Sequence, residues 1–295
     1  MAPKANLTMS ANIEVKAREI DFVTRFGDTW ESLREILSIM RMIRKENGTV
    51  LKTKSASIVL QDGKVGEGEE IPYSLASVEE TPYGEITIEK YAKAVSIEAV
   101  DEHGAEAAIN MTDEAFLNEL QGNVLDRFYA HLATGTLTSN EATFQMAVAM
   151  AIGKVKDKFK KMRKNHSKIV VWVNTLDAYK YLGAAELTVQ SAFGIDYVEN
   201  FMGADKMILS SEIAEGKVIA TPVDNIICYY VDPSNSGFRK LGLEYTVSGE
   251  TPIIGFHANG NYNTAVGESF ALMGLTLLTE YIDAIAVVTS KPIPS

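Results

Sequence analysis

Residues 49–135 contain the feature that most constrains the fold, a long hairpin pattern followed by a long helical pattern. We expect a first strand over Val50–Leu60 and a second over Glu85–Val100, joined by the turn-rich segment QDGKVGEGEEIPYSLASVEETPYG. The sixteen residues of the second strand would span about 50 Å when extended. Typical strands have about 5–6 residues, so the sequence predicts an unusually long hairpin.

Both expected strands are too polar for the centre of a sheet. The first carries Lys52 and Lys54, and the second carries Lys90 and Lys93. A lone two-stranded hairpin is only marginally stable in water, so this one must pack against another surface. That surface is either the chain's own core or a second copy of the same chain, and the polarity of the strands leaves both open.

Helical spacing of apolar residues predicts one helix before the hairpin and one after it. The first is expected from a cap at Asp28 or Thr29 to a stop at Gly48, following an extended arm over residues 1–26. It would dock on the home core or on a neighbour. The second is expected over Thr112–Ala133. Its apolar side chains recur every four residues, at Phe116, Leu120, Val124, Phe128 and Leu132.

A third amphipathic helix, over Asn140–Lys164, ends in the basic run KVKDKFKKMRKNHSK. This run would contact nucleic acid or an acidic neighbour, or it is a solvated face that complements the helix dipole. The second interpretation is favoured because no aromatic platform lies between the lysines.

The segment from Glu141 to Val247 is expected to form a compact α/β or α+β domain. The apolar run KIVVWVN, from Lys168 to Asn174, predicts a buried strand, and a short helix follows it. A helix or strand is expected up to Leu278 and a last strand over Ala284–Thr289. Three more strands are expected at Lys206–Leu209, Lys217–Ala220 and Asn225–Val231.

Charge and cysteine content exclude several classes of protein. The net charge of −11 and the pI near 5.0 argue against broad binding to nucleic acid or to an anionic membrane surface. The single cysteine, Cys228, lies in an apolar run and allows no disulfide within the chain. No signal-peptide pattern and no apolar run of membrane-spanning length is present, so we expect a reducing, cytoplasm-like compartment.

No motif in the sequence predicts catalysis, a cofactor or a metal. Gly63, Gly66 and Gly68 form a G-x-x-G-x-G pattern, but no core strand precedes it and acidic residues follow it, so it predicts a flexible turn rather than a phosphate site. The four histidines form no metal-binding pair, and His257 has the most polar surroundings of the four. We therefore predict that the chain is not an enzyme.

The order of the predicted elements, with four local segments, resembles the major capsid protein of tailed bacteriophages, which has the Hong-Kong-97-type shell fold. The sequence is especially similar to capsid proteins of siphophages that infect low-GC Gram-positive hosts. The segments that carry the resemblance are LDRFYAHLATGTL, KIVVWVNTLDAYKYL, KVIATPVDNIICYYVDPSNSGF and LMGLTLLTEYIDAIAVVT.

The resemblance implies an α+β fold with four parts. They are an N-terminal arm with a helix (1–48), an extended hairpin loop (49–100), a peripheral domain with a spine helix (101–140 and 249–295) and an axial domain (141–248). The hairpin would lie over a neighbouring subunit. The candidate contact residues between subunits are Trp30, Lys52, Lys54, Gly63, Gly66, Gly68, Lys90, Tyr91 and Lys93.

The implied function is to build an icosahedral shell of hexamers and pentamers around phage double-stranded DNA. The shell would assemble in the host cytoplasm and form part of the virion, with a portal, a possible decoration protein and a separate scaffolding protein as partners. A scaffolding partner is implied because the chain starts almost directly at the arm, without the charged scaffolding segment of some family members. The alternatives are a bacterial encapsulin-like nanocompartment shell, a ring-forming tail component and a soluble α/β enzyme.

Overall fold

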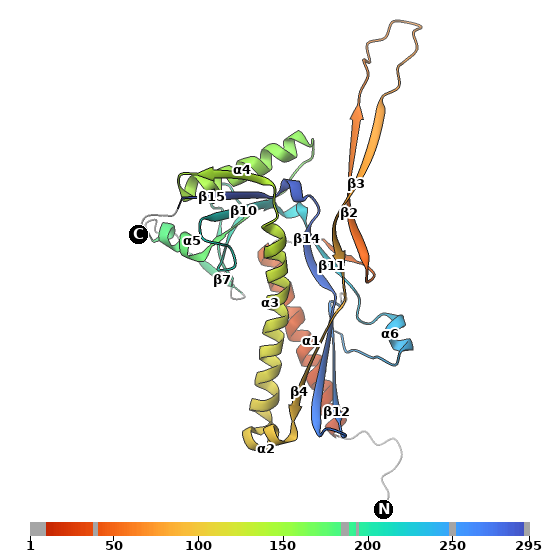
Figure 1. Cartoon of the computed structure of the whole chain (residues 1–295), viewed down its shortest axis with the longest axis vertical. Coiled ribbons are helices and arrows are strands. Elements are labelled where there is room, and N and C mark those ends of the chain that lie inside the picture. The colour runs from red at the N-terminus through yellow and green to blue at the C-terminus, as the bar shows by residue number, and fades with distance from the viewer. Residues whose placement is uncertain (1–9, 38–40, 184–188, 193–194, 248–251, 292–295) are drawn as a thin grey trace, which may run out of the picture.

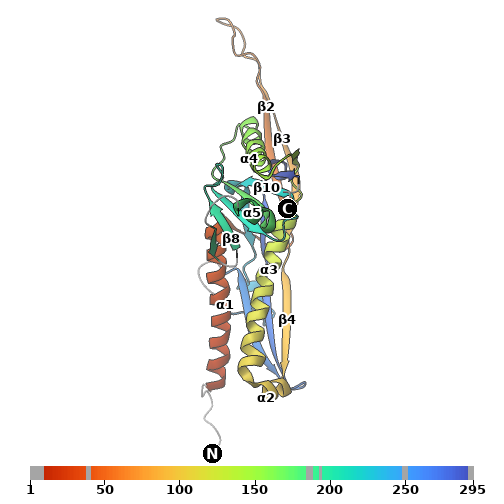
Figure 2. The same ribbon diagram turned by 90° about the vertical axis from the view of Figure 1, so that its left-hand side faces the viewer.

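The computed structural model describes residues 10–37, 41–183, 189–192, 195–247 and 252–291. Figure 1 shows an elongated body around the helix α3, a lobe at the upper left, and a hairpin that projects beyond both at the upper right. The molecule is narrow when it is turned by a quarter (Figure 2).

The body consists of two long helices and a three-stranded antiparallel sheet. The sheet has the order β12-β13-β4, with β12 at Ile254–Asn261, β13 at Val266–Met273 and β4 at Glu89–Ser96. Helix α3, Thr112–Leu132, confirms the helix predicted over Thr112–Ala133. Helix α1, Ser10–Leu37, lies beside it (Figures 1 and 2).

Aromatic side chains from α1 join the core of the body. The Phe22 ring stacks on that of Phe256, with ring centroids 4.0 Å apart, and Trp30 is only 4% exposed. From α3, the apolar stripe is buried as predicted at Leu120, Val124, Phe128 and Leu132, and Phe116 is partly buried. Trp30, the first apolar residue of the predicted helix, therefore packs on the home core.

The lobe is built on a mixed seven-stranded sheet of order β5-β15-β10-β6-β9-β8-β7. Successive residues of β6 point to opposite faces: Val171 and Val173 join the core under α4, while Val170 and Trp172 join the core shared with α3. A strand that is covered on both faces has a nearly continuous run of apolar residues. This explains why the segment KIVVWVN shows no alternation of polar and apolar residues. The bounds are β5 Leu137–Glu141, β6 Ile169–Asn174, β7 Gln190–Ala192, β8 Ile195–Glu199, β9 Lys206–Ser210, β10 Lys217–Pro222 and β15 Ala286–Ser290.

Helix α4, Phe144–Lys161, covers one face of this sheet, together with α5, Thr175–Leu182. A third sheet, β1-β11-β14, lies where the hairpin leaves the body. Its strands are β1 Met42–Arg44, β11 Ile226–Tyr230 and β14 Leu275–Thr279. The other helical segments are α2 Ile97–Ala105, a π-helix at Glu106–Met111, α6 Ser236–Lys240, and 3₁₀ turns at Val223–Asn225 and Ile282–Ala284.

The hairpin pairs β2, Thr49–Val59, with β3, Leu75–Ile86, in antiparallel register. The prediction that Glu85–Val100 is the second hairpin strand was therefore wrong. Most of β3 lies in the segment that was expected to form the tip, whereas Glu89–Ser96 is β4 of the body sheet. Proline and glycine in β3 suggested turns, but a strand without a buried face needs no apolar alternation, and an edge position tolerates proline.

The N-terminal predictions also need correction. The described part of the expected extended arm is helical, because α1 begins at Ser10, and the expected continuation of the helix to Gly48 is interrupted by β1 at Met42–Arg44. Phe22, Val23 and Phe26 of α1 are buried against the body, so packing on the body stabilises its helical state. Residues 1–9 and 38–40 lie outside the described residues.

The segment 249–295 supplies strands to three sheets. Strands β12 and β13 belong to the body, β14 to the sheet at the hairpin's base, and β15 to the lobe, where it pairs with β10 and β5. The last strand was predicted correctly to within two residues. Nothing in the arrangement tests the four-part division, which stays a prediction. Among the described residues, no helix combines the length and apolar character needed to cross a membrane.

Candidate assembly surface

The root of the hairpin is packed into its own subunit. Leu51 and Ile86, one on each strand, are buried in a small core with Ile227 of β11 and Leu278 of β14. Gly84 lies so close to this core that a Cβ atom there would be 2.7 Å from Leu278 Cδ1. The first residues of the hairpin therefore have a fixed position on the body.

Polar contacts complete the attachment of the root. The hydroxyl groups of Tyr83 and Tyr229 are 2.5 Å apart, and the Thr53 hydroxyl donates to the backbone carbonyl of Glu280. Burial raises the pKa of both tyrosines above its ordinary value. The raised pKa values keep both phenols protonated to a higher pH than exposed tyrosines.

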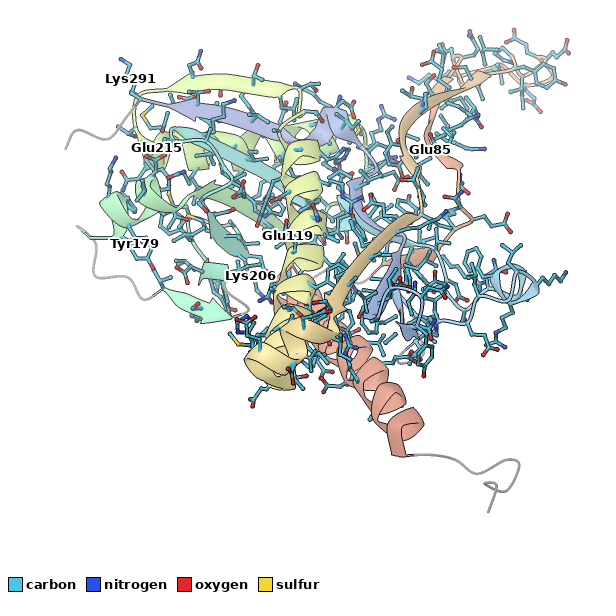
Figure 3. All side chains as sticks on the ribbon, turned by 60° about the horizontal axis from the view of Figure 1, so that its bottom comes forward. Glu85, Glu119, Tyr179, Lys206, Glu215 and Lys291 are labelled. Atoms are coloured by element: carbon cyan, nitrogen blue, oxygen red, sulfur yellow. The ribbon has the colours of Figure 1, made fainter. Side chains whose placement is uncertain are left out.

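Beyond the root, the hairpin leaves the protein surface and exposes apolar side chains. Tyr73 is 93% exposed and Leu75 71%. Figure 3 shows side chains standing out on all sides of the hairpin beyond Glu85, away from the lobe that carries Tyr179 and Lys291. Exposed apolar side chains gathered in one place mark an interaction site. The others here are Ile58, Val59, Leu60, Ile71 and Val78.

Ionic contacts on the outer hairpin join its two strands. Lys52 Nζ and Lys54 Nζ lie 3.3 and 2.8 Å from the carboxylate of Glu80 on the facing strand. Hydrogen bonds from the two lysines hold the pKa of Glu80 below its ordinary value. Exposed pairs of this kind contribute little stability, so they align the strands without supplying the burial that the hairpin lacks.

The residues predicted to contact a neighbour fall into two groups. Lys52, Lys54 and the three tip glycines lie on the free part of the hairpin, where Gly68 has the positive φ of +85° that favours glycine. Trp30, Lys90, Tyr91 and Lys93 lie in the body, where Trp30 is buried and Tyr91 packs against the core. Contact with a neighbour stays a prediction for both groups.

Sequence reasoning missed the apolar side chains at the tip, Ile71 and Tyr73. The available signal was two large apolar residues in a segment otherwise made of glycine, proline and acidic residues. Turn segments seldom keep such side chains without a partner surface.

A buried ionic cluster attaches α1 to the body. Arg18 donates to both carboxylate oxygens of Asp113, at 2.6 and 2.8 Å, and Lys93 Nζ lies 2.6 Å from the same carboxylate. Burial alone would raise the pKa of Asp113, but the hydrogen bonds from Arg18 and Lys93 hold it below its ordinary value. Lys93 thus has an ionic partner within its own chain.

A second carboxylate on α1 is buried against the body sheet. Glu19 accepts hydrogen bonds from the Ala258 backbone N–H, at 2.8 Å, and from the Thr246 hydroxyl, and it lies 3.3 Å from His257 Nδ1. His257, the histidine with the most polar surroundings, is thereby placed beside a structural carboxylate. Within the described residues, no three His, Cys, Asp or Glu side chains are grouped to hold a metal ion.

No protein-family model matches the sequence, and neither does any curated protein. Solved structures do match. One from Gordonia phage Cozz has a TM-score of 0.60 at 10% identity, over 89% of this chain and 87% of that one. The mature capsid of bacteriophage PhiM1 has a TM-score of 0.54 at 7% identity, over 86% of each chain. One from Mycobacterium phage Che8 has a TM-score of 0.52 at 12% identity, over 83% and 85%.

The chain has the Hong-Kong-97-type fold. The likeness covers 83–89% of the chain, so the predicted α+β fold class is confirmed. The outer half of the hairpin, with its exposed apolar side chains, is the candidate assembly surface.

Proposed function

We propose that this chain is the major capsid protein of a tailed bacteriophage. It would self-assemble as hexamers and pentamers into an icosahedral shell that encloses the phage's double-stranded DNA. The single observation that carries the proposal is the hairpin's free outer half, with apolar side chains exposed on a fold that the PhiM1 mature capsid shares.

The physical argument concerns burial. A two-stranded hairpin is marginal in water, and each exposed apolar side chain forgoes roughly 1.5–3 kcal/mol that burial would supply. The root already uses the available surface of β11 and β14. A second copy of the chain would supply the missing surface, because every copy carries both the hairpin and the face that receives it.

Such a contact joins two different surfaces of identical chains. Contacts of this type form closed rings when the rotation between neighbours closes, as hexamers and pentamers require. The function is then structural, with no catalytic step. The net charge of −11 suits a shell that encloses DNA without binding it in a sequence-specific way.

The remaining expectations belong to this proposal. The partners are a separate scaffolding protein, a portal and a possible decoration protein, and the protein would be part of the virion after assembly in the host cytoplasm. A Gram-positive host and the four-part domain division are proposed on the sequence resemblance alone.

The test is negative-stain microscopy with light scattering on the expressed chain. Closed shells, or rings of five and six subunits, are the expected result. A chain that stays monomeric at high concentration, with and without a co-expressed scaffolding protein, would contradict the proposal. Absorbance at 260 nm of particles from infected cells separates a DNA-filled head from a nanocompartment that contains protein cargo.

A further inference from the structure

The tip of the hairpin combines apolar and acidic side chains. Ile71 and Tyr73 are highly exposed, and Glu67, Glu69 and Glu70 precede them in the chain. Glu69 also accepts a hydrogen bond of 2.8 Å from the Gly66 N–H, which shapes the turn. Within the described part of the chain, none of the three glutamates forms an ion pair. We call these five residues the tip surface.

Helix α4 has an outer face that is complementary to this surface. Met146 and Met150 are 49% and 40% exposed there, and a Cβ atom on Gly153 would have no neighbour within 4 Å. Lys156 and Lys160 continue the exposed side toward the helix C-terminus. We call these five residues the α4 outer face. The opposite face is buried on the lobe sheet through Ala147, Val148, Ala151, Ile152, Val155 and Phe159.

The helix dipole explains only part of the positive charge. Cations are stabilised in the last turn of a helix, where Lys158 and Lys161 are also paired with Asp283 and Asp157, at 2.6 Å each. Lys156 lies before that turn, and neither it nor Lys160 has an ionic partner within the described residues. Their charge remains available to an acidic partner.

We propose that the tip surface of one copy docks on the α4 outer face of a second copy. This inference rests on the proposed shell function and names the surface that receives the hairpin. Ile71 and Tyr73 would cover the two methionines, whose flexible thioethers adapt to aromatic rings. The three glutamates would lie along Lys156 and Lys160.

The composition of the two surfaces agrees, because each places apolar side chains beside charged ones and the charges are of opposite sign. An apolar centre flanked by charged groups is also the usual composition of a protein interface.

The receiving helix belongs to a second copy because the hairpin cannot reach its own. Figures 1 and 2 both show the hairpin tip well beyond the lobe, and the packed root fixes the direction in which the hairpin leaves the body. Each copy offers one tip surface and one α4 outer face, so the contact repeats around a ring.

The first test reverses the charges of each surface. E67K/E69K/E70K and K156E/K160E should each reduce the assembled fraction by about tenfold, whereas the two sets combined should restore assembly, because attraction returns with the signs exchanged. The control R239E/K240E makes a similar charge change on α6 and should leave assembly unchanged. Light scattering and negative-stain microscopy are the readouts, and circular dichroism confirms folding.

The second test measures proximity directly. With Tyr73→Cys and Met150→Cys in one chain, mild oxidation of assembled particles should produce covalent ladders on a non-reducing gel. Cys228 is buried and does not compete. Tyr73→Cys with Leu176→Cys, an exposed position on α5, is the matched control and should give no ladder.

The outcomes separate the docking inference from the shell proposal. Wild-type shells that form normally, with no rescue by the combined charge reversal and no ladder above the control, would overturn the docking inference and leave the shell proposal standing. A wild-type chain that never assembles would overturn both.

Discussion

Helix α1 and the hairpin were both candidates for docking on a neighbour, but α1 packs along its own body whereas the outer hairpin stands free of it (Figure 1). The helix buries Phe22, Phe26 and Trp30 in its own subunit and adds two buried carboxylate contacts. The outer hairpin buries none of its large apolar side chains. The comparison shows that a long extension alone does not indicate a partner, whereas unburied apolar surface on a fixed root does.

The largest expected effect comes from shortening the hairpin. Removing Ala56–Val78 and joining Ser55 to Glu79 through Asn-Gly keeps the register, in which these two residues face each other. Assembly should be abolished while the monomer keeps its melting temperature within a few degrees, since no buried residue is lost. A deletion of residues 55–95 would also remove β4, so it serves as the unfolding control.

The outcome that would contradict this comparison is a shortened chain that unfolds, because the outer hairpin would then belong to the home core. Shells of normal size from the shortened chain would instead show that the hairpin is not needed for assembly. Size-exclusion chromatography with light scattering distinguishes both from the expected folded monomer.

The next effect concerns helix α1, which is packed on its own subunit. Phe22→Ala should reduce the free energy of unfolding by about 3–5 kcal/mol, because it leaves a cavity beside Phe256 in the body core. Tyr73→Ala, on the exposed tip, should change the stability of the monomer by less than about 0.5 kcal/mol. Urea unfolding measures both changes in the free energy of unfolding. Phe22→Ala is measured in the monomeric chain with the shortened hairpin, and Tyr73→Ala is measured in the full-length monomer.

If Phe22→Ala and Tyr73→Ala lowered the free energy of unfolding equally, the distinction between a helix packed on its own subunit and a hairpin free to contact another would fail. A small effect at Phe22 would mean that α1 is released from the body in solution.

A smaller effect should appear on acidification. The folded-state pKa of Asp113 lies below its ordinary value of 3.8, so its ion pairs add stability that is present above that value and lost as the pH falls through the folded-state pKa. The unfolding free energy of the wild type should therefore drop below about pH 4 more steeply than that of Asp113→Asn. Parallel curves for the two proteins would exclude this role, and Glu85→Gln, at an exposed carboxylate, is the control.

The smallest effect concerns Gly122 of α3, which lines a cavity between α3 and α1. A cavity of about 240 Å³ lies between them, lined by Trp30, Gln121 and Gly122 among others, and a Cβ atom on Gly122 would meet nothing within 4 Å. Gly122→Ala should therefore raise the unfolding free energy by about 0.5–1 kcal/mol through better helix propensity. Gly135→Ala is the contrasting control, since its Cβ would lie 2.7 Å from Ile285 and should destabilise the protein.

The sequence predicted those helices and strands that bury one face, or both faces, in the protein's own core. In these elements the spacing of apolar residues follows directly from the secondary structure. Helices α3 and α4 and strand β6 fall in this class. Leu120, Val148 and Val171 each belong to a series of buried apolar residues whose spacing matches the secondary structure of that element. The fold class followed from the order of these elements and from the resemblance to phage capsid proteins.

The sequence did not predict the elements whose state depends on contacts far along the chain. Strand β3 is exposed from Leu75 to Pro82, so no apolar alternation marks this part of it. Helix α1 has a weak period, and the ion pair that attaches it joins Arg18 to Asp113, 95 positions apart. The lysines of the hairpin were identified as contact candidates, but the apolar tip that accompanies them was not.

The register of the hairpin shifts between Leu51 and Lys52, within its packed root. A bulge there increases the local twist and bends the bulged strand. The direction in which the outer hairpin projects is therefore determined when the single chain folds, before any other copy is present. A subunit joining a growing ring would then need little rearrangement, and the angle between adjacent subunits would already be encoded in one residue step of one strand pair.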